Sequence, residues 1–353
     1  MKGLFYIGVM LVLLLAGCDK VDAGCGKNDG EAWPVSFMLA GVTPTRADGA
    51  TGVADGTELT VAAYDPNSQN LVAARNYKVT NGTLALDETD GEAMYLSVGT
   101  YDFCAMTPRQ VLTGAGKDGK HGSIQQGVDA LGSVTRAQVL ADATTAIQLN
   151  NLDHLASQIS FTVQVVPQKV DSIASFAVQK IEIEGMVAEK ENNYQLPKNR
   201  LVIPEEGADG CFQSLTISGD GAFSVKQAGE EKGPGYINTQ QTPLVVFPKA
   251  ESTFKALIDV SVKRKVKQED GTFTESNLET ITLNAKINRL AFDPGKRYNF
   301  EVNYGWDYVR FNITVVPWTT VTDDSTTGSG EKTVSHTISI NQWNDDIELD
   351  MTI

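Results

Sequence analysis

The chain has 353 residues, 41% of them hydrophobic, with 32 glycines and 12 prolines. That length can bury two cores of ordinary domain size, so we expect two domains. The formal net charge of -15 at pH 7 argues against nucleic acid and anionic membrane surfaces as electrostatic partners, because both would repel an acidic protein.

The first predicted element is an export signal over residues 1–17. Lys2 precedes an apolar run from Leu4 to Leu15, and small residues lead from that run to Cys18. About a dozen apolar residues rise only about 18 Å as a helix, too short for a hydrocarbon core of roughly 30 Å. The tetrad Leu-Ala-Gly-Cys resembles a bacterial lipobox, so we expect lipidation of Cys18 and an outer-membrane anchor. Alternatively, Cys18 is merely a small residue near an ordinary cleavage site.

A strand with one strongly apolar face is expected next. Its inward residues alternate with smaller or more polar ones in the sequence WPVSFML; they are Trp33, Val35, Phe37 and Leu39. The sequence VTPTRADG follows over residues 42–49, with Arg46 set among small and turn-forming residues. Neither a core nor a loop requires a cation there, although an ordinary solvated arginine is the simpler interpretation.

The remainder of the chain is dominated by period-two alternation. The alternating apolar sets are Leu59, Val61 and Ala63; Ile159, Phe161, Val163 and Val165; Ile181 and Ile183; Leu244 and Val246; Leu257 or Ile258 through Val262; and Phe311, Ile313 and Val315. Asn-Gly and Asp-Gly turn signals separate them. Helical patterns are short, over 135–143 and 153–157. We therefore predict an all-β fold of two tandem antiparallel β-sandwiches, spanning 47–151 and 152–353, with few short helices.

No set of residues predicts catalysis, a cofactor or a metal. Residues 114–120 fit GxxxxGK, but His121 replaces the hydroxyl residue and no helical pattern follows, so we interpret the segment as a mobile surface loop. Acidic pairs are adjacent in sequence, which points their side chains to opposite faces of an extended chain. CxxC and GxSxG do not occur, and the three histidines are far apart. We expect a protein that is not an enzyme.

Two cysteines, Cys104 and Cys211, remain after Cys18 and the nearby Cys25. In an oxidising envelope they could form a disulfide, but two buried thiols are the alternative because the residues fall in different predicted domains. The late aromatic residues could fill a core, line an interface or stack on a sugar; they are Trp306, Tyr308, Trp318 and Trp343.

The end of the sequence predicts a strand that is built to be buried. Its apolar residues alternate with acidic and polar ones; they are Ile347, Leu349, Met351 and Ile353. Terminal residues are usually polar and frayed, so this pattern is unusual. The polar segment 323–331 precedes the last strands over 333–353 and could let them swing away from the body.

Several motifs together resemble the fimbrillin-type pilins of type V pili in anaerobic Gram-negative bacteria. They are the lipobox, VSFMLAG followed by TPTRADG, HLASQISFTV from His154, PGKRYNFEVNY from Pro294 and VVPWTT from Val315. Their order and spacing cover most of the chain. One departure is Gln158, where the family usually has a basic residue.

The resemblance implies transthyretin-like sandwiches and a surface pilus subunit supporting cell adhesion. It implies that a protease cuts between Arg46 and Ala47, releasing the propeptide 18–46 with its strand and lipid anchor. Losing that strand would strip one edge from a sandwich and open an apolar groove. The terminal strand of a neighbouring pilin subunit could fill it by strand addition. The alternative is a non-polymerised surface lipoprotein or tip adhesin that binds a glycan or host protein.

Overall fold

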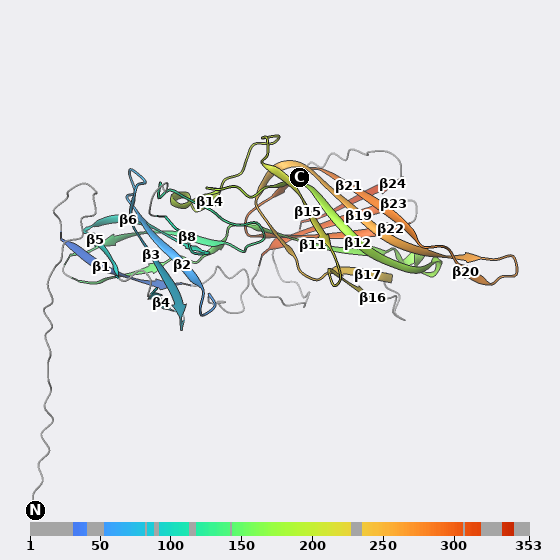
Figure 1. The fold of residues 1–353 in the computed structure, drawn as a ribbon, viewed down its shortest axis with the longest axis horizontal. Helices are drawn as coiled ribbons and strands as arrows, with labels where there is room; N and C mark the ends of the chain where they lie inside the picture. The colour runs from blue at the N-terminus through green and yellow to red at the C-terminus, as the bar shows by residue number, and fades with distance from the viewer. Residues whose placement is uncertain are drawn as a thin grey trace, which may run out of the picture. The chain divides into compact units, whose positions relative to one another are not determined.

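The structure is a computed structural model, and it describes residues 31–40, 53–81, 83–87, 92–112, 118–141, 143–226, 235–305, 308–318 and, for the backbone alone, 334–341. The chain divides into the units Met1–Glu31 and Ala32–Ile353, and the second is described here. Its described residues form strands β1 to β24 and two short 3-10 helices, η1 (Pro167–Ser172) and η2 (Leu196–Lys198) (Figure 1). The predicted all-β fold with few helices is confirmed.

One sheet comprises the first part of the described chain, and we call it the first module. Its strands are β1 (Ala32–Leu39), β2 (Glu58–Tyr64), β3 (Leu71–Thr80), β4 (Thr83–Leu86), β5 (Met94–Ser97), β6 (Gly99–Thr107), β8 (Leu131–Val139), β9 (Thr145–Leu149) and β10 (Asp153–His154). The hydrogen-bonded order is β10-β8-β6-β2-β3-β4-β1-β5, and β9 pairs with β1. One face of this sheet encloses a core built around Phe37, Leu59, Phe103 and Leu149.

Two further sheets form what we call the second module. The first contains β11 (Ser157–Val165), β16 (Phe223–Lys226), β17 (Gly235–Gln240), β18 (Leu244–Val246), β22 (Lys296–Gly305), β23 (Tyr308–Pro317) and β24 (Val334–Asn341). The second contains β12 (Ile173–Val187), β15 (Phe212–Ser218), β19 (Lys249–Lys267), β20 (Phe273–Glu275) and β21 (Glu279–Phe292).

The core of the second module is larger and more continuous than that of the first. The ring of Phe300 stacks on Phe161 and Phe254 with centroid separations of 5.0 and 4.8 Å. Phe176 stacks on Tyr304 in the same core. These side chains come from both sheets, because alternate residues of β11 and β22 point inward and meet alternate residues of β12 and β19.

A small third sheet links the two modules. It consists of β7 (His121–Gly122), β13 (Tyr194–Gln195) and β14 (Arg200–Leu201), in the order β14-β13-β7. The segment 188–211, which leaves the second module after β12, lies against the face of β2 and β6 opposite the first core. Tyr64, Cys104 and Met106 on that face pack with Tyr194 and Leu196 of the segment. Both faces of β2 are therefore buried.

The structure corrects two predictions of helix. Residues 135–139, placed in a helical segment, belong to β8 and pair with β6 through Phe103 and Thr135. The segment 153–157 contains β10 and the first residue of β11 rather than a helix. In both places the segment pairs with a neighbouring strand, β8 with β6 and β10 with β8, and this pairing outweighs the weak local helix pattern.

The sheets are mainly antiparallel, with two parallel pairings. β1 runs parallel to β9, and β11 runs parallel to β22 over eight residue pairs from Gln158↔Arg297 to Val165↔Tyr304. Cys104 and Cys211 are free thiols; Cys104 is buried and Cys211 is partly buried. Burial raises the pKa of the Cys104 thiol to about 12, which keeps it protonated and unreactive at neutral pH.

Candidate functional site

The predicted first strand is an interior strand of the first module. Val35 of β1 pairs with Met94 of β5 on one side and with Thr145 of β9 on the other. Farther along, Met38 pairs with Thr83 of β4 and with Gln148 of β9. The expectation that this strand forms an edge of the sandwich is wrong, because β9, which comes late in the sequence of the module, pairs with its second side.

The alternation of β1 places its apolar residues in the first core. Val35 and Phe37 are 3% and 4% exposed, and Trp33 and Leu39 are partly buried against the same core. The ring of Phe37 makes edge contacts with Tyr77 and Phe103 at centroid distances of 5.5 and 5.4 Å. Met38, on the opposite face, is 46% exposed.

Withdrawal of β1 would leave a slot with two hydrogen-bonding walls. One wall is formed by β4 and β5 and the other by β9, so backbone donors and acceptors on both would lose their partners. The floor of the slot would be the rings of Tyr77 and Phe103, which contact Phe37 in the intact module. Such a slot suits an extended chain with alternating apolar residues.

All the predicted site residues other than those of β1 lie outside the described residues. They are Cys18, Arg46, Ala47, Ile347, Leu349, Met351 and Ile353. Trp306 and Trp343 are also outside. The last described strand, β24, pairs antiparallel with β23 at the edge of its sheet, with Ile338 opposite Phe311.

Three of the sequence motifs that carry the family resemblance meet at one place. The indole of Trp318 stacks on the ring of His154 with a centroid distance of 4.2 Å, and His154 Nδ1 lies 2.7 Å from Asp129 Oδ1. The Trp318 amide donates to the Gly295 carbonyl, and the Gly295 amide donates to the Ala156 carbonyl, both at 2.8 Å. The position of Trp318 is therefore structural, in a buried junction.

Gln158 has a local explanation in the same junction. The Arg297 guanidinium donates to Gln158 Oε1 across the parallel pairing of β11 and β22. Burial lowers the pKa of Arg297. A second cation at position 158 would face this partly desolvated guanidinium, so a neutral amide oxygen is the better partner.

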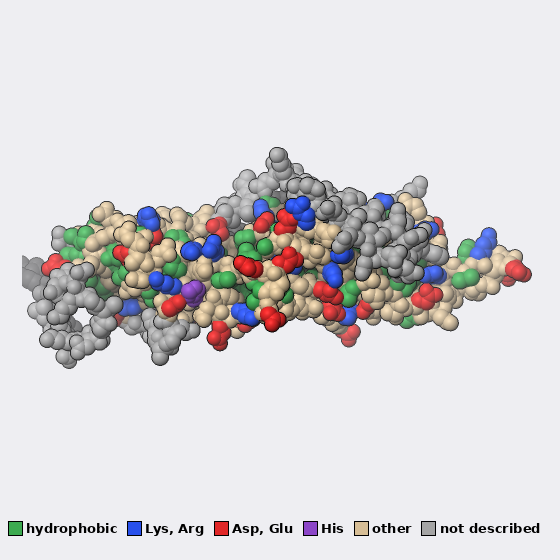
Figure 2. Space-filling model, turned by 90° about the horizontal axis from the view of Figure 1, so that it is seen from above, with side chains coloured by type: hydrophobic (Ala, Val, Ile, Leu, Met, Phe, Trp, Pro, Cys, Tyr) green, Lys and Arg blue, Asp and Glu red, His purple; other side chains and the backbone are tan. Residues whose placement is uncertain are grey.

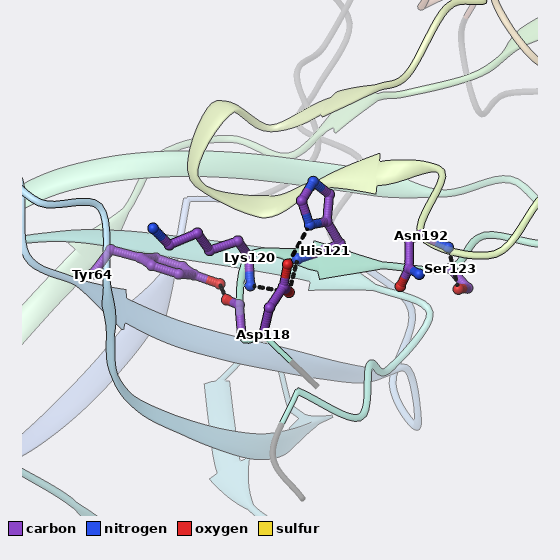
Figure 3. A network of polar contacts seen from close by, with 7 residues as sticks. Tyr64, Asp118, Lys120, His121, Ser123 and Asn192 are labelled. Carbon is purple, nitrogen blue, oxygen red and sulfur yellow. Dashed lines mark hydrogen bonds and ion pairs between the residues drawn. The ribbon is translucent and has the colours of Figure 1, made fainter. Parts of the chain in front are cut away.

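The loop with the GxxxxGK pattern is not built to hold a phosphate. In its described part, the backbone amides of Lys120 and His121 donate to Asp118 Oδ1 at 2.8 and 3.0 Å, and the Tyr64 hydroxyl donates to the Gly119 carbonyl at 2.7 Å. These contacts are drawn in Figure 3. The amides that a phosphate would need already bind a carboxylate, and a strand, β7, follows. The described part of this predicted mobile loop is held by these bonds.

Neither a metal site nor a membrane helix is found in the described part of the chain. No group of three or more His, Cys, Asp or Glu residues within it is arranged to hold a metal ion. Among the same residues, no helix has the length and hydrophobicity needed to cross a membrane.

Comparison with known proteins places the chain in a family. The model of the fimbrillin-like family matches residues 45–318, whereas a search of curated proteins found no match. A fimbrial protein from Bacteroides vulgatus has a similar structure, with a TM-score of 0.55 at 12% identity over 82% of this chain and 100% of that one.

Two further solved structures share the fold. A candidate cell adhesion protein from Bacteroides ovatus has a TM-score of 0.50 at 14% identity, covering 82% of this chain and 99% of its own. One from Parabacteroides distasonis has the same TM-score and coverage at 12% identity. The family match covers most of the chain and includes the sequence motifs that meet around Trp318. The chain therefore belongs to the fimbrillin-like family, a family of fimbria-related surface proteins rather than of enzymes.

Proposed function

We propose that the chain is a structural subunit of a surface pilus that assembles by donor-strand exchange. In this proposal it is exported as a lipoprotein anchored to the outer membrane through Cys18 and is processed after Arg46. The propeptide 18–46 then leaves with β1, and two sandwiches over 47–151 and 152–353 remain. Leu152 packs in the first core and β10 pairs with β8 of the first module, whereas Ser157 opens β11 of the second, which supports a boundary a few residues after Asn151.

The observation that carries the proposal is the position of β1. A strand paired on both sides and anchored by Phe37 fills the middle of its sheet, yet it precedes the rest of the module in sequence. A single cut in the segment 41–52 would make it a separate peptide. Until then, β1 blocks its own slot and prevents premature association.

The donor in this proposal is the terminal segment of a neighbouring subunit. Its residues Ile347, Leu349, Met351 and Ile353 have the same spacing as Trp33, Val35, Phe37 and Leu39. Burying each such side chain contributes about 1.5–3 kcal/mol, and the two walls of the slot add backbone hydrogen bonds. A polymer joined in this way would dissociate very slowly.

The first test is the N-terminal sequence of the protein purified from the native cell surface. We expect the mature protein to begin at Ala47 and the chain with Arg46→Ala to remain full length and lipidated, as measured by intact mass. A native protein that begins at lipidated Cys18 would contradict processing. That result would favour a stand-alone surface lipoprotein or a tip adhesin that binds a glycan or host protein.

The donor assignment has its own test. Replacing Ile347, Leu349, Met351 and Ile353 with serine should give a folded monomer that forms no fibres in electron micrographs. The matched control replaces the intervening Glu348, Asp350 and Thr352 with alanine and should still form fibres. Fibres of normal length from the serine variant would exclude this segment as the donor.

A further inference from the structure

A two-stranded ribbon extends from the second module with its own charge pattern. The pairing of β12 with β19 ends at Arg264, and beyond it β19 pairs only with β20, through Lys265↔Glu275, Val266↔Thr274 and Lys267↔Phe273. Figure 1 shows this ribbon reaching past the other strands. Its tip is fixed by hydrogen bonds from Gln268 to the Thr272 carbonyl and from Thr272 to Asp270 Oδ1.

One face of this ribbon is basic and apolar. Directly opposed residues share a face, so Lys265 and Lys267 lie with Phe273 and Glu275. Glu275 already pairs with Lys263, at 3.4 Å, while neither Lys265 nor Lys267 has an ion-pair partner among the described residues. Phe273 is 63% exposed. We call Lys265, Lys267 and Phe273 the hairpin face; Figure 2 shows hydrophobic and basic side chains on the ribbon, with acidic side chains at its end.

A second exposed patch on the same chain has the opposite charge. Val202 and Ile203 are 41% and 45% exposed, and Glu205 and Asp209 follow them, also exposed. We call these four residues the acidic loop. Its backbone is held in place, since the Val202 amide donates to the Asn193 carbonyl at 2.7 Å and the Ala208 amide donates to the Glu205 carbonyl at 3.1 Å.

We propose that the hairpin face of one copy docks on the acidic loop of a second copy of this chain. Each patch combines exposed apolar side chains with charged side chains that form no ion pair among the described residues, and the charges are opposite, so contact buries apolar surface and brings opposite charges together. A net charge of -15 makes copies repel one another in general. A local basic face on such an acidic chain therefore favours one orientation, in which the hairpin face meets the acidic loop of the second copy.

The two patches differ, so the contact is heterologous. The hairpin of each copy meets the loop of the next, which leaves one free hairpin and one free loop at the ends and can continue along a row of copies. This contact involves neither β1 nor the terminal segment. It therefore stands or falls separately from the proposed strand exchange.

The test uses a mixture of unlabelled and 15N-labelled full chain carrying Arg46→Ala, so that strand exchange plays no part. A zero-length carbodiimide cross-linker joins lysines to carboxylates in contact. We expect mixed-isotope peptide pairs between Lys265 or Lys267 and Glu205 or Asp209. Lys265→Glu with Lys267→Glu should lower the yield of cross-linked dimer about tenfold.

The decisive variant exchanges the charges of the hairpin face and the acidic loop. Adding Glu205→Lys and Asp209→Lys to the reversed hairpin returns the net charge to that of the Arg46→Ala parent chain and should restore the dimer. Glu206 is left unchanged because it interacts with Lys249. The control, Lys78→Glu with Lys226→Glu, changes two exposed lysines elsewhere and should keep most of the dimer. Absence of hairpin-to-loop pairs, no recovery in the fourfold variant, or an equal loss in the control would overturn the proposal.

Discussion

The two modules enclose their cores in different ways. The first module is completed by a strand from its own beginning, β1, held between β4 and β5 on one side and β9 on the other. The second is built on the long strand β19, which pairs with the long strands β12 and β21 along most of their length. A module filled by a strand from its own beginning fits the proposed strand exchange, whereas the continuous strands of the second module offer no equally separable piece.

The sharpest way to test this difference is Phe37→Ala. The substitution removes a ring held between Tyr77 and Phe103, so we expect the free energy of unfolding of the first module to fall by about 3–5 kcal/mol. Hydrogen exchange monitored by mass spectrometry should show a larger loss of protection in β2 and β6 than in β19 and β21. Met38→Ala, on the exposed face of the same strand, is the control. Equal loss in both modules would mean that β1 is not specific to the first.

The link between the modules can be broken at Gly132. A Cβ there would lie 2.1 Å from Asn199 Oδ1 and 2.9 Å from the Tyr194 hydroxyl, two atoms that hydrogen-bond at 2.6 Å. We expect Gly132→Ala to cost about 1–3 kcal/mol and to separate the unfolding transitions of the modules in calorimetry. Gly99→Ala, whose Cβ would meet Tyr101 only at 3.5 Å, should leave one transition; two transitions in the parent protein would refute the coupling.

In the second module, replacing the buried Lys249 is expected to stabilise the fold. Burial lowers its pKa, partly opposed by Glu206, and its ammonium lies 5.8 Å from the centre of the Phe212 ring. Because the folded pKa lies below the unfolded value, the charged form destabilises the fold at neutral pH. This loss of folding free energy shrinks as the pH rises above the folded pKa of Lys249, and it is gone once the pH exceeds the unfolded value of 10.5. Lys249→Met should therefore stabilise the fold by about 1 kcal/mol at pH 7.

The pH dependence provides the check on that prediction. The advantage of Lys249→Met, measured by urea denaturation, should shrink as the pH approaches the unfolded pKa. The exposed Lys255 is the control, since its replacement by methionine should change stability little at either pH. A destabilised Lys249→Met protein would show that the contact with Phe212 outweighs the desolvation of the ammonium.

The smallest effect is expected at Asp118. Hydrogen bonding to the His121 ring and to backbone amides lowers the pKa of Asp118 to about 2. The stability from this depressed pKa is fully present above the unfolded value of 3.8 and is lost as pH falls toward 2. The carboxylate is half exposed, so Asp118→Asn should cost only about 0.5 kcal/mol at pH 7. Carbon-13 NMR of the carboxyl group should follow this titration; an ordinary pKa would contradict the network.

Alternation in the sequence predicts strands well but does not predict their neighbours. The spacing of Trp33, Val35, Phe37 and Leu39 indicates a strand with one apolar face, and the structure describes β1 in that form. Period two says nothing about which strands lie on either side, so the interior position of β1 depends on β9, more than a hundred residues later. The proposed donor segment, residues 347–353, lies outside the described residues.

The burial of both faces of β2 is indicated by its composition, although not by alternation. The sequence ELTVAAY of β2 is apolar at nearly every position, which is typical of strands buried on both faces. Only the folded chain reveals that the segment 188–211 covers the second face. Likewise, the motifs around His154, Gly295 and Trp318 are separated in sequence and join through backbone hydrogen bonds that no local pattern encodes.

The interior position of β1 also bears on the order of synthesis. The ribosome makes this strand first, but its partners on both sides are made later, and the parallel partner β9 comes last of them. The first module therefore cannot close its sheet until nearly all of it has been translated, and contacts of such long sequence separation form slowly. The strands that pair with β1 therefore stay incompletely paired until late in synthesis.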